Sequence, residues 1–355
     1  MNAAVAGTKN AVKNIRHLSL TELEAFFATI GEKKFRAKQV WEWLWMKHAH
    51  SFADMTNLSK ELRQKLGESF SLPALTVDAT QYSADGTIKS RFTTHEGHLC
   101  EGVLIPTESR YTACVSSQIG CSLSCKFCAT GYIERKRNLD FDEIYDEVVL
   151  INQQTERVYG KKLSNIVFMG MGEPLLNYKN VLKAIERITA EDGLAMSPRR
   201  ITVSTAGVAK MIRQLGDDKV RFKLALSLHA PNDTKRNEIM PINETNNLKA
   251  LIEALNHFYK QTKNEITLEY ILFNNFNDSE KDAQELIKIY RQVPADLVNI
   301  IEYNPIDFAQ FEKPSDERME QFMGYLAKAK VNAHLRRSRG KDIDAACGQL
   351  ANKDN

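Results

Sequence analysis

Helical periodicity dominates the first part of the chain. Between Ser19 and Phe70 apolar residues recur every three to four positions, and Ser19 with Glu22 three residues later forms a capping-box pattern. We therefore predict a small helical domain over residues 1–75, with a frayed polar start over residues 1–16. The residues that would share one face of its clearest helix are Val40, Trp41, Leu44 and Trp45.

Strand patterns follow the helical region. Thr87–Phe92 and Leu99–Ile105 are rich in apolar and β-branched residues and flank a turn at Glu96-Gly97. Pro106 would end the second strand. We predict a β-hairpin linker over residues 76–110.

Strand and helix patterns alternate from Tyr111 onward, which predicts a parallel sheet with helices outside. The expected strands are Ala113–Ser117, Asn165–Phe168, Arg200–Ser204, Phe222–Leu228, Ile266–Leu272 and Val298–Tyr303. The expected helices include Asp140–Gln154, Tyr178–Thr189, Val208–Leu215, Leu248–Tyr259 and Ser279–Gln292. Six βα units are fewer than the eight of a closed barrel, so the α/β fold class is an open, partial (βα)6 barrel over residues 111–305.

The last part of the chain, residues 306–355, is predicted as a C-terminal extension. It would contain a helix over Asp316–Lys330, a strand over Val331–Arg336 and a tail that carries Cys347. Together these patterns describe a partial barrel with a small helical N-terminal domain and a C-terminal extension.

Composition narrows the class of protein. The chain has 355 residues, 43% hydrophobic and 26% charged, and a formal net charge of +3, which is too small to establish nucleic-acid binding. No run of 18 apolar residues and no signal-peptide pattern occur, so we expect no membrane segment and a cytoplasmic protein. Six cysteines, three of them clustered, do not look like a disulfide framework.

The clustered cysteines carry the strongest chemical signal. Cys121, Cys125 and Cys128 are spaced C-x3-C-x2-C, with Phe127 before the last one. Thiolates hold iron–sulfur clusters, and a cubane usually takes four, so three would leave one iron open for a ligand. This spacing resembles the radical S-adenosylmethionine (SAM) superfamily, in which SAM binds the open iron. The alternatives are a zinc site or three unrelated buried thiols, but no second pair of metal-binding residues at zinc spacing is present.

Further motifs resemble one family within that superfamily. They are Cys114–Gln118, Met169–Pro174, Val203–Gly207, Ser227–Ala230, Asn304-Pro305 and the tail Arg336–Gly340 with Ala345–Leu350. This set, in this order from about Phe35 to Leu350, resembles the RlmN/Cfr family of radical SAM RNA methyltransferases, and the tail is closer to the RlmN branch. Two departures are Cys100, where an aliphatic residue is expected, and the absence of a Gly-rich continuation after Asn304-Pro305.

The resemblance implies a [4Fe–4S] cluster on Cys121, Cys125 and Cys128, and two SAM molecules per turnover. The SAM site would contain the following residues, most of them near strand ends: Gly172, Glu173, Ser204, Ser227, Leu228, His229 and Asn304. Glu173 can accept from the SAM ammonium group, and Gly170 and Gly172 would let the backbone approach the ligand. A packed core histidine is the alternative for His229.

Three further residues would carry the methyl transfer. By resemblance, Cys347 is methylated by one SAM, a radical from a second SAM activates that methyl group, and it joins adenine C2. Cys114 would then form a disulfide with Cys347 and release the product. We predict that Glu101 removes the C2 proton. The alternatives are buried packing cysteines and a surface strand carboxylate, and we interpret Cys100 as a packing residue.

The resemblance also implies partners. They are 23S rRNA at the peptidyl-transferase centre, tRNA at the adenine 3′ of the anticodon, and an electron donor such as flavodoxin or ferredoxin; we expect a monomer. Arg135–Arg137 and Arg336–Arg339 could contact phosphates, and so could the N-terminal Lys33, Lys34, Arg36 and Lys38, but solvated surface charge fits equally. Two other functions stay open: adenine C8 methylation as in Cfr, and a non-enzymatic cluster- or metal-bearing RNA-binding protein.

Overall fold

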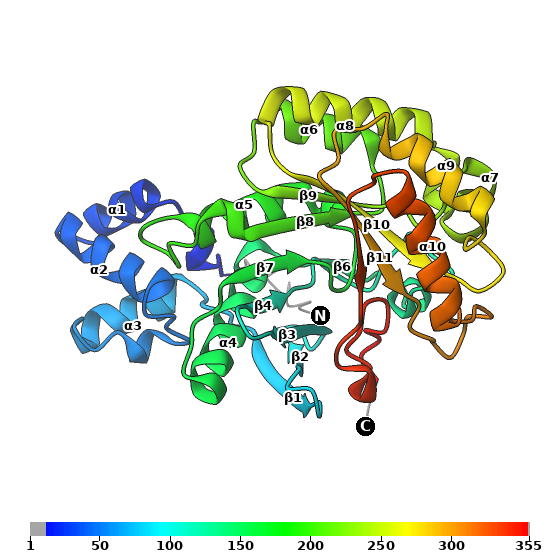
Figure 1. Ribbon diagram of the computed structural model, residues 1–355. Coiled ribbons are helices and arrows are strands. Elements are labelled where there is room, and N and C mark those ends of the chain that lie inside the picture. Colours follow the sequence, from blue (N-terminus) through cyan, green and yellow to red (C-terminus); the bar gives the residue numbers. More distant parts are fainter. Residues whose placement is uncertain (1–11, 354–355) are drawn as a thin grey trace, which may run out of the picture. The chain divides into compact units, whose positions relative to one another are not determined.

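The computed structural model describes residues 12–353, which divide into two compact units (Figure 1). One unit holds residues 12–74 with Arg187–Ala195, and the other holds Leu75–Glu186 with the residues from Met196 onward. Residues 1–11 of the predicted frayed start lie outside the described residues. For residues 12–16 that prediction is wrong, because Ile15 is buried and its N–H donates to the Ser71 carbonyl at 3.0 Å.

The first unit is helical, as predicted. Its α-helices are α1 (Leu20–Thr29), α2 (Lys34–Trp45) and α3 (Lys60–Ser69), with 3₁₀ turns at Ile15–His17 and Phe52–Asp54. Ser19 caps α1 and exchanges hydrogen bonds with Glu22, which confirms the capping box. On α2, Val40, Leu44 and Trp45 are fully buried, so the apolar face found in the sequence is the core of this unit.

A distant segment completes the helical unit. The Arg187 guanidinium lies over the rings of Trp41 and Trp45, with centroid distances of 4.9 and 5.0 Å. Trp41 Nε1 donates to Asp192 Oδ2 at 2.7 Å. The domain predicted to end at residue 75 did not include residues 187–195. Nothing in the local sequence of that segment indicates that it packs with the helical unit.

The second unit is built on one ten-stranded sheet of described residues, in the order β1-β2-β3-β4-β7-β8-β9-β10-β11-β12. Its antiparallel strands are β1 (Thr76–Tyr82), β2 (Ile88–Thr93) and β3 (Leu99–Pro106), which continues antiparallel to β4 (Tyr111–Cys114). The parallel strands that follow are β7 (Asn165–Phe168), β8 (Ile201–Thr205), β9 (Lys223–Ser227), β10 (Ile266–Leu272), β11 (Leu297–Glu302) and β12 (Ala333–Arg336). A separate two-stranded ladder joins β5 (Gln118–Ile119) to β6 (Arg137–Asn138).

The hairpin predicted as a linker is therefore an extension of the barrel sheet. The predicted turn at Glu96-Gly97 is present, and β2 and β3 pair around it. We did not predict β1 as a separate strand, and none of its seven residues is buried. The strand predicted in the C-terminal extension also belongs to the sheet, because β12 pairs in parallel with β11.

Helices cover the outside of the curved parallel strands (Figure 1). They are α4 (Phe141–Tyr159), α5 (Tyr178–Thr189), α6 (Ala209–Asp217), α7 (Asp233–Ile239), α8 (Leu248–Thr262), α9 (Glu280–Tyr290) and α10 (Asp316–Lys328). Short 3₁₀ turns lie at Ala129–Tyr132, Pro174–Asn177, Pro198–Arg200, Pro241–Glu244 and Lys341–Ile343. Among residues 12–353, no helix has the length and apolar character needed to cross a membrane.

Strand register decides which side chains meet inside the barrel. Glu269 on β10 lies opposite Ser227 on β9 and Asn299 on β11. Ile301 on β11 lies opposite Arg336 on β12. The described sheet begins at β1 and ends at β12 without closing, which confirms the expected open barrel. In such barrels the loops after the parallel strands carry the chemistry.

Candidate active site

The cysteine loop lies between β5 and the 3₁₀ turn Ala129–Tyr132. Gly120 begins it with φ +73°, and a Cβ there would lie 2.4 Å from the Glu134 carbonyl oxygen, so only glycine fits. Cys121 N–H donates to the Ile133 carbonyl at 3.2 Å, and Lys126 N–H donates to the Ile239 carbonyl at 3.0 Å. These bonds hold a loop that has no regular secondary structure of its own.

All three cysteines of the loop face one cavity. Burial raises the pKa of Cys121 to about 11, and it raises the pKa of Cys125 and Cys128 as well. Their thiolates therefore need a compensating cation, as a cluster iron would supply. Within the loop, the Phe127 ring packs edge-on against the His229 ring, with centroids 4.9 Å apart. Phe127 also belongs to a buried apolar cluster with Phe273.

The loop after β7 brings glycines and a carboxylate to the same cavity. Gly172 has φ +91°, and a Cβ there would lie 2.5 Å from Gln118 Cβ. A Cβ on Gly170 would lie 2.7 Å from the Val115 carbonyl oxygen. We expected both glycines to let the backbone approach a ligand. Both line the cavity, and the atoms that a Cβ at either position would crowd belong to residues 115–118.

Glu173 is held by the backbone on both oxygens. Its Oε1 accepts the Leu175 N–H at 2.9 Å, and its Oε2 accepts the Ala206 N–H at 2.7 Å. The side chain is buried, and burial raises its pKa although the two N–H groups oppose this effect. Each carboxylate oxygen has a second lone pair, so Glu173 can still accept from a ligand ammonium group.

The predicted SAM residues divide into those that line this cavity and those that do not. The lining members are Gly172, Glu173, Ser204, Ser227 and His229. Ser204 Oγ and Ser227 Oγ lie 3.3 Å apart. His229 Nδ1 accepts the Ile271 N–H at 3.1 Å, and burial lowers the pKa of His229 to about 3, so its ring is neutral. His229 is therefore a packed histidine that also lines the cavity, and its contact with a ligand stays a prediction.

Leu228 and Asn304 act from outside the lining. The Leu228 side chain is completely buried. Asn304 Nδ2 donates to Ser338 Oγ at 2.9 Å and to the Cys347 carbonyl at 3.3 Å. Asn304 thus holds the tail that carries Cys347 in this structure.

Cys347 lies where two cavities meet. It lines the first cavity with the three loop cysteines, and it lines a second, larger one together with Cys114. The fold thus brings together two cysteines that are far apart in the sequence. Burial raises the pKa of Cys114 to about 12, and the nearby Arg336 guanidinium opposes this effect. Both cysteines are free thiols.

Glu101 lies on β3, buried, and lines neither cavity. Its Oε2 accepts the backbone N–H groups of Ala351 and Asn352 at 2.9 and 3.1 Å. Its Oε1 lies 3.6 Å from Lys89 Nζ. Glu101 therefore anchors the chain just after Cys347, which sequence reasoning did not foresee.

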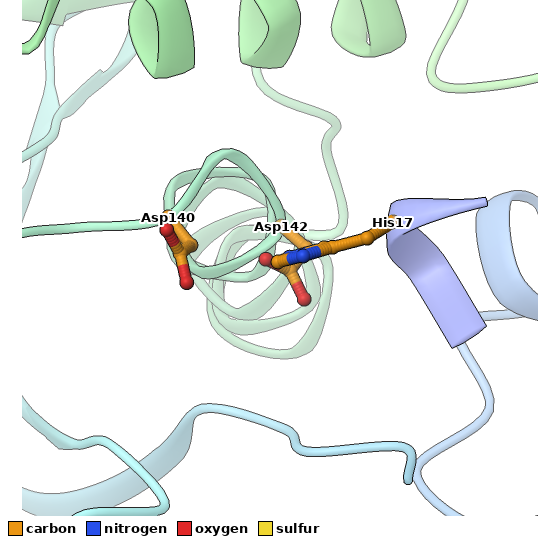
Figure 2. A group of neighbouring side chains, drawn as sticks. All are labelled: His17, Asp140 and Asp142. Atoms are coloured by element: carbon orange, nitrogen blue, oxygen red, sulfur yellow. The ribbon is translucent and has the colours of Figure 1, made fainter. Parts of the chain in front are cut away.

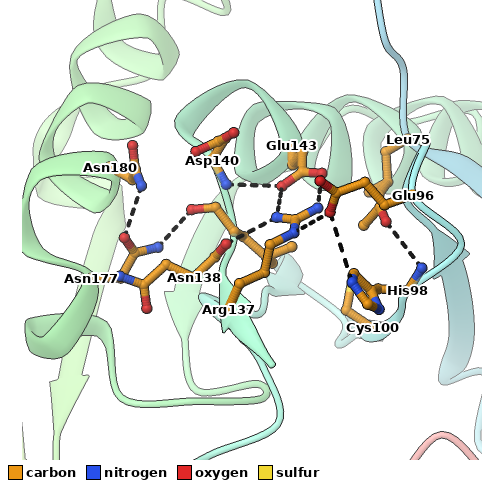
Figure 3. Close-up of polar contacts among 12 residues, drawn as sticks. Leu75, Glu96, His98, Cys100, Arg137, Asn138, Asp140, Glu143, Asn177 and Asn180 are labelled. Atoms are coloured by element: carbon orange, nitrogen blue, oxygen red, sulfur yellow. Dashed lines mark hydrogen bonds and ion pairs between the residues drawn. The ribbon is translucent and has the colours of Figure 1, made fainter. Parts of the chain in front are cut away.

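The predicted basic groups are largely engaged by carboxylates. Figure 3 shows the Arg137 guanidinium between Glu143, with bonds of 2.7 and 2.8 Å, and Glu96, at 2.5 Å. Arg337 pairs with Asp316 at 2.8 Å. Glu143 also belongs to the first turn of α4, which begins at Phe141 after the N-cap Asp140. Figure 2 shows Asp140 and Asp142 at this end of the helix. Arg137 therefore fixes the end of the cysteine segment to α4 and has little capacity left for phosphate.

Sequence reasoning missed Glu269 as a site residue and gave Arg336 only a phosphate contact. Arg336 and Glu269 line both cavities. Glu269 Oε1 accepts from Thr267 and Asn299 at 2.8 Å each, while Oε2 lies 3.9 Å from Arg336 Nη1. Arg336 Nη1 also lies 3.8 Å from Met169 Sδ. For Glu269, the only signal in the sequence was a carboxylate within an otherwise apolar strand, and it belonged to no motif.

The residues present fit the cofactors that the motif implies. A single loop contributes three partly buried thiols to a cavity that also receives the Glu173 carboxylate and the Ser204 and Ser227 hydroxyls. Sulfur ligands suit iron, and the polar groups suit the amino acid and ribose parts of SAM. The chemistry of this donor set matches a [4Fe–4S] cluster with SAM beside it.

Comparison with known proteins gives a consistent picture. The family model for the ribosomal RNA large subunit methyltransferase N-terminal domain matches residues 13–72, and the radical SAM superfamily model matches residues 115–287. The chain is 58% identical over 342 residues to the probable dual-specificity RNA methyltransferase RlmN of Cytophaga hutchinsonii, covering 96% of this chain and 93% of that protein. It is 53% identical to the protein of the same description from Christiangramia forsetii, covering 98% of each.

A solved structure is also similar throughout. The crystal structure of a radical SAM methyltransferase from Sphaerobacter thermophilus superposes with a TM-score of 0.89 and 39% sequence identity. The match covers 95% of this chain and 99% of that chain.

Proposed function

The chain belongs to the RlmN family of radical SAM, dual-specificity RNA methyltransferases, and on this premise we propose that it makes 2-methyladenosine in RNA. The proposed substrates are the adenine in the peptidyl-transferase centre of 23S rRNA and the adenine 3′ of the tRNA anticodon. We further propose a cytoplasmic monomer that receives electrons from a flavodoxin or ferredoxin.

One observation carries the proposal: Cys347 lines both the cavity of the three loop cysteines and the cavity of Cys114. A carbon bound to Cys347 can therefore be activated on one side and released on the other. Cys121, Cys125 and Cys128 would hold the cluster, and Glu173, Ser204, Ser227 and His229 would hold SAM. When bound, this pair supplies both a methyl group and a radical able to take hydrogen from it.

Cys347 serves as the carrier of the transferred carbon. Adenine C2 is electron-poor, so polar methyl transfer from SAM to C2 is unfavourable, and a sulfur-bound carbon radical offers another route. The bond that forms joins the Cys347 methylene carbon to C2, and the target base must be unstacked to reach it. The second cavity, lined by Cys114, Cys347 and Arg336, is the space we assign to that base.

Cys114 ends the reaction. After the adduct has lost the C2 proton and its unpaired electron, which the oxidised cluster would take up, the Cys114 thiolate attacks Cys347 sulfur, a disulfide forms, and the sulfur–carbon bond breaks with its electron pair on carbon. Protonation of that carbon gives the methyl group. Because burial opposes ionisation of Cys114, the neighbouring Arg336 charge supports its thiolate.

Glu101 is our candidate for removal of the C2 proton, and its contacts define when it can act. In this structure its Oε2 is occupied by the Ala351 and Asn352 N–H groups. We propose that the tail moves away from Glu101 when RNA binds. This movement frees the Glu101 carboxylate on β3. A base must reach hydrogen-bond distance of its proton, so this release is required for the role.

The test is anaerobic turnover of reconstituted enzyme with a strong reductant, SAM and either a 23S rRNA fragment or tRNA. Mass spectrometry of the digested nucleosides separates 2-methyladenosine from 8-methyladenosine. 2-Methyladenosine in both RNAs is the expected product. 8-Methyladenosine would assign the Cfr reaction instead. A SAM-cleaving enzyme that makes neither would overturn the proposed substrates, and failure to cleave SAM would favour a non-enzymatic RNA-binding protein.

A further inference from the structure

Arg236 on α7 is completely buried and belongs to no predicted motif. Its guanidinium uses all of its edges. Nε donates to the Leu228 carbonyl at 3.0 Å, and Nη2 donates to the Ala206 and Ser227 carbonyls at 2.5 and 3.1 Å. These three carbonyls belong to the ends of β8 and β9, where the SAM-site residues lie.

The remaining contact fixes the guanidinium from behind. Nη1 donates to Asn243 Oδ1 at 2.6 Å, and Asn243 Nδ2 donates to Asp233 Oδ1 at 2.9 Å. All four acceptors of Arg236 are neutral oxygens. Burial lowers the pKa of Arg236 to about 10, so the group still carries its charge at neutral pH. Its donors are in a rigid planar arrangement that lysine cannot reproduce.

The Ala206 backbone links Arg236 to the ligand side of the cavity. Its carbonyl accepts from Arg236, and its N–H donates to Glu173 Oε2 at 2.7 Å. These two groups belong to the peptides on either side of the Ala206 Cα, so fixing the carbonyl restrains the residue whose N–H holds the Glu173 carboxylate. The next residue, Gly207, has φ +107°, and a Cβ there would lie 3.2 Å from Arg236 Nη2. The guanidinium therefore packs closely against this part of the backbone.

The same short helix also touches the cluster loop. The Ile239 carbonyl at the end of α7 accepts the Lys126 N–H at 3.0 Å, between Cys125 and Cys128. One seven-residue helix thus connects three loops: the cluster loop, the loop after β8 and the loop after β9. Of these three loops, the Arg236 side chain forms hydrogen bonds with the loops after β8 and β9.

We infer that Arg236 is a positioning residue for SAM, because it fixes the Ala206, Ser227 and Leu228 peptides and, through Ala206, the Glu173 carboxylate. This inference rests on the proposed function, in that SAM is the ligand of this cavity. The [4Fe–4S] cluster itself would be held by another loop. Loss of the Arg236 hydrogen bonds should therefore lower SAM affinity more than it lowers cluster content.

The experiment measures SAM dissociation constants by equilibrium dialysis with reconstituted wild-type, Arg236→Gln and Arg236→Lys proteins, together with iron per chain and thermal unfolding. For Arg236→Gln we expect a SAM dissociation constant raised about 10- to 100-fold, as for other residues that orient ligand-binding groups, with iron content unchanged. Arg236→Lys keeps the charge but loses the fork, so we expect an intermediate value.

Arg318→Gln is the matched control, because Arg318 makes a similar fork with Asp278 at 2.8 and 2.9 Å outside the SAM cavity. It should lose stability while SAM affinity stays within twofold. Unchanged affinity in Arg236→Gln, or an equal loss in Arg318→Gln, overturns the inference. If Arg236→Gln does not fold, unchanged affinity in Arg236→Lys overturns it. Wild-type protein that holds the cluster but binds no SAM would instead overturn the proposed function.

Discussion

The Glu101 carboxylate accepts the backbone N–H of Ala351 at 2.9 Å, four residues after Cys347. The same group lies 3.6 Å from Lys89 Nζ, and both side chains of this ion pair are almost completely buried. One carboxylate therefore connects the core of the sheet to the tail that carries Cys347. This link makes the position of Cys347 sensitive to the charge of Glu101.

Glu101→Gln should loosen the tail and destabilise the protein. Removing one member of a buried ion pair leaves the other charge uncompensated, which typically costs roughly 3 kcal/mol or more. Denaturant unfolding measures that loss, and hydrogen exchange of residues 345–353 measures the tail. The control is Lys89→Met/Glu101→Gln, which should recover stability. If the double variant also resolves the RNA adduct at the wild-type rate, Glu101 is not the base.

Glu147 should make stability fall as pH rises. It is completely buried on α4, its Oε2 accepts the Ser116 N–H at 2.9 Å, and burial raises its pKa well above the usual 4.5. Folding then takes up a proton between the unfolded and folded pKa values. The favourable contribution is complete below the unfolded pKa and is lost as pH rises through the folded one, by at most about 1.4 kcal/mol per pH unit.

The measurement for Glu147 is denaturant unfolding of wild type and Glu147→Gln from pH 5 to pH 8. Glutamine cannot ionise, so the variant should show a flatter profile than wild type over this range. Parallel profiles would show that Glu147 does not take up a proton on folding.

Gly172→Ala should weaken both the fold and SAM binding. Its φ of +91° costs an L-residue about 1–2 kcal/mol, and the new Cβ would also lie 2.5 Å from Gln118 Cβ. Gly97→Ala is the matched control, because Gly97 has φ +84° with no atom within 4 Å of a new Cβ. The difference in unfolding free energy between the two variants measures the cost of the close contact between the new Cβ and Gln118, separately from the cost of the positive φ. Equal losses, with SAM affinity unchanged in both, would contradict the account.

Local patterns predicted much of this protein. The C-x3-C-x2-C spacing identified Cys121, Cys125 and Cys128, and alternating βα patterns gave the partial barrel. The resemblance, in turn, supplied Cys347 and Cys114, which the structure places around one cavity. These features are visible in sequence because the chemistry needs fixed residue types at fixed spacing.

What the sequence could not show depends on contacts between distant segments. The Glu101 bond to Ala351 joins residues 250 positions apart, and neither residue has a local signal for it. The seven-residue helix α7 is too short to show a clear helical period in the sequence. The role we infer for Arg236 depends on its three carbonyl acceptors, which come from other segments of the chain.

The carrier role of Cys347 is tested by trapping the carbon bridge between Cys347 and RNA. Cys114→Ala protein is supplied with reductant, SAM and RNA, then digested with protease and nuclease and examined by mass spectrometry. The account predicts an adenosine joined through one carbon to the Cys347 peptide, and no such adduct in Cys347→Ala. Free 2-methyladenosine formed by Cys114→Ala at the wild-type rate, without an adduct, would contradict it.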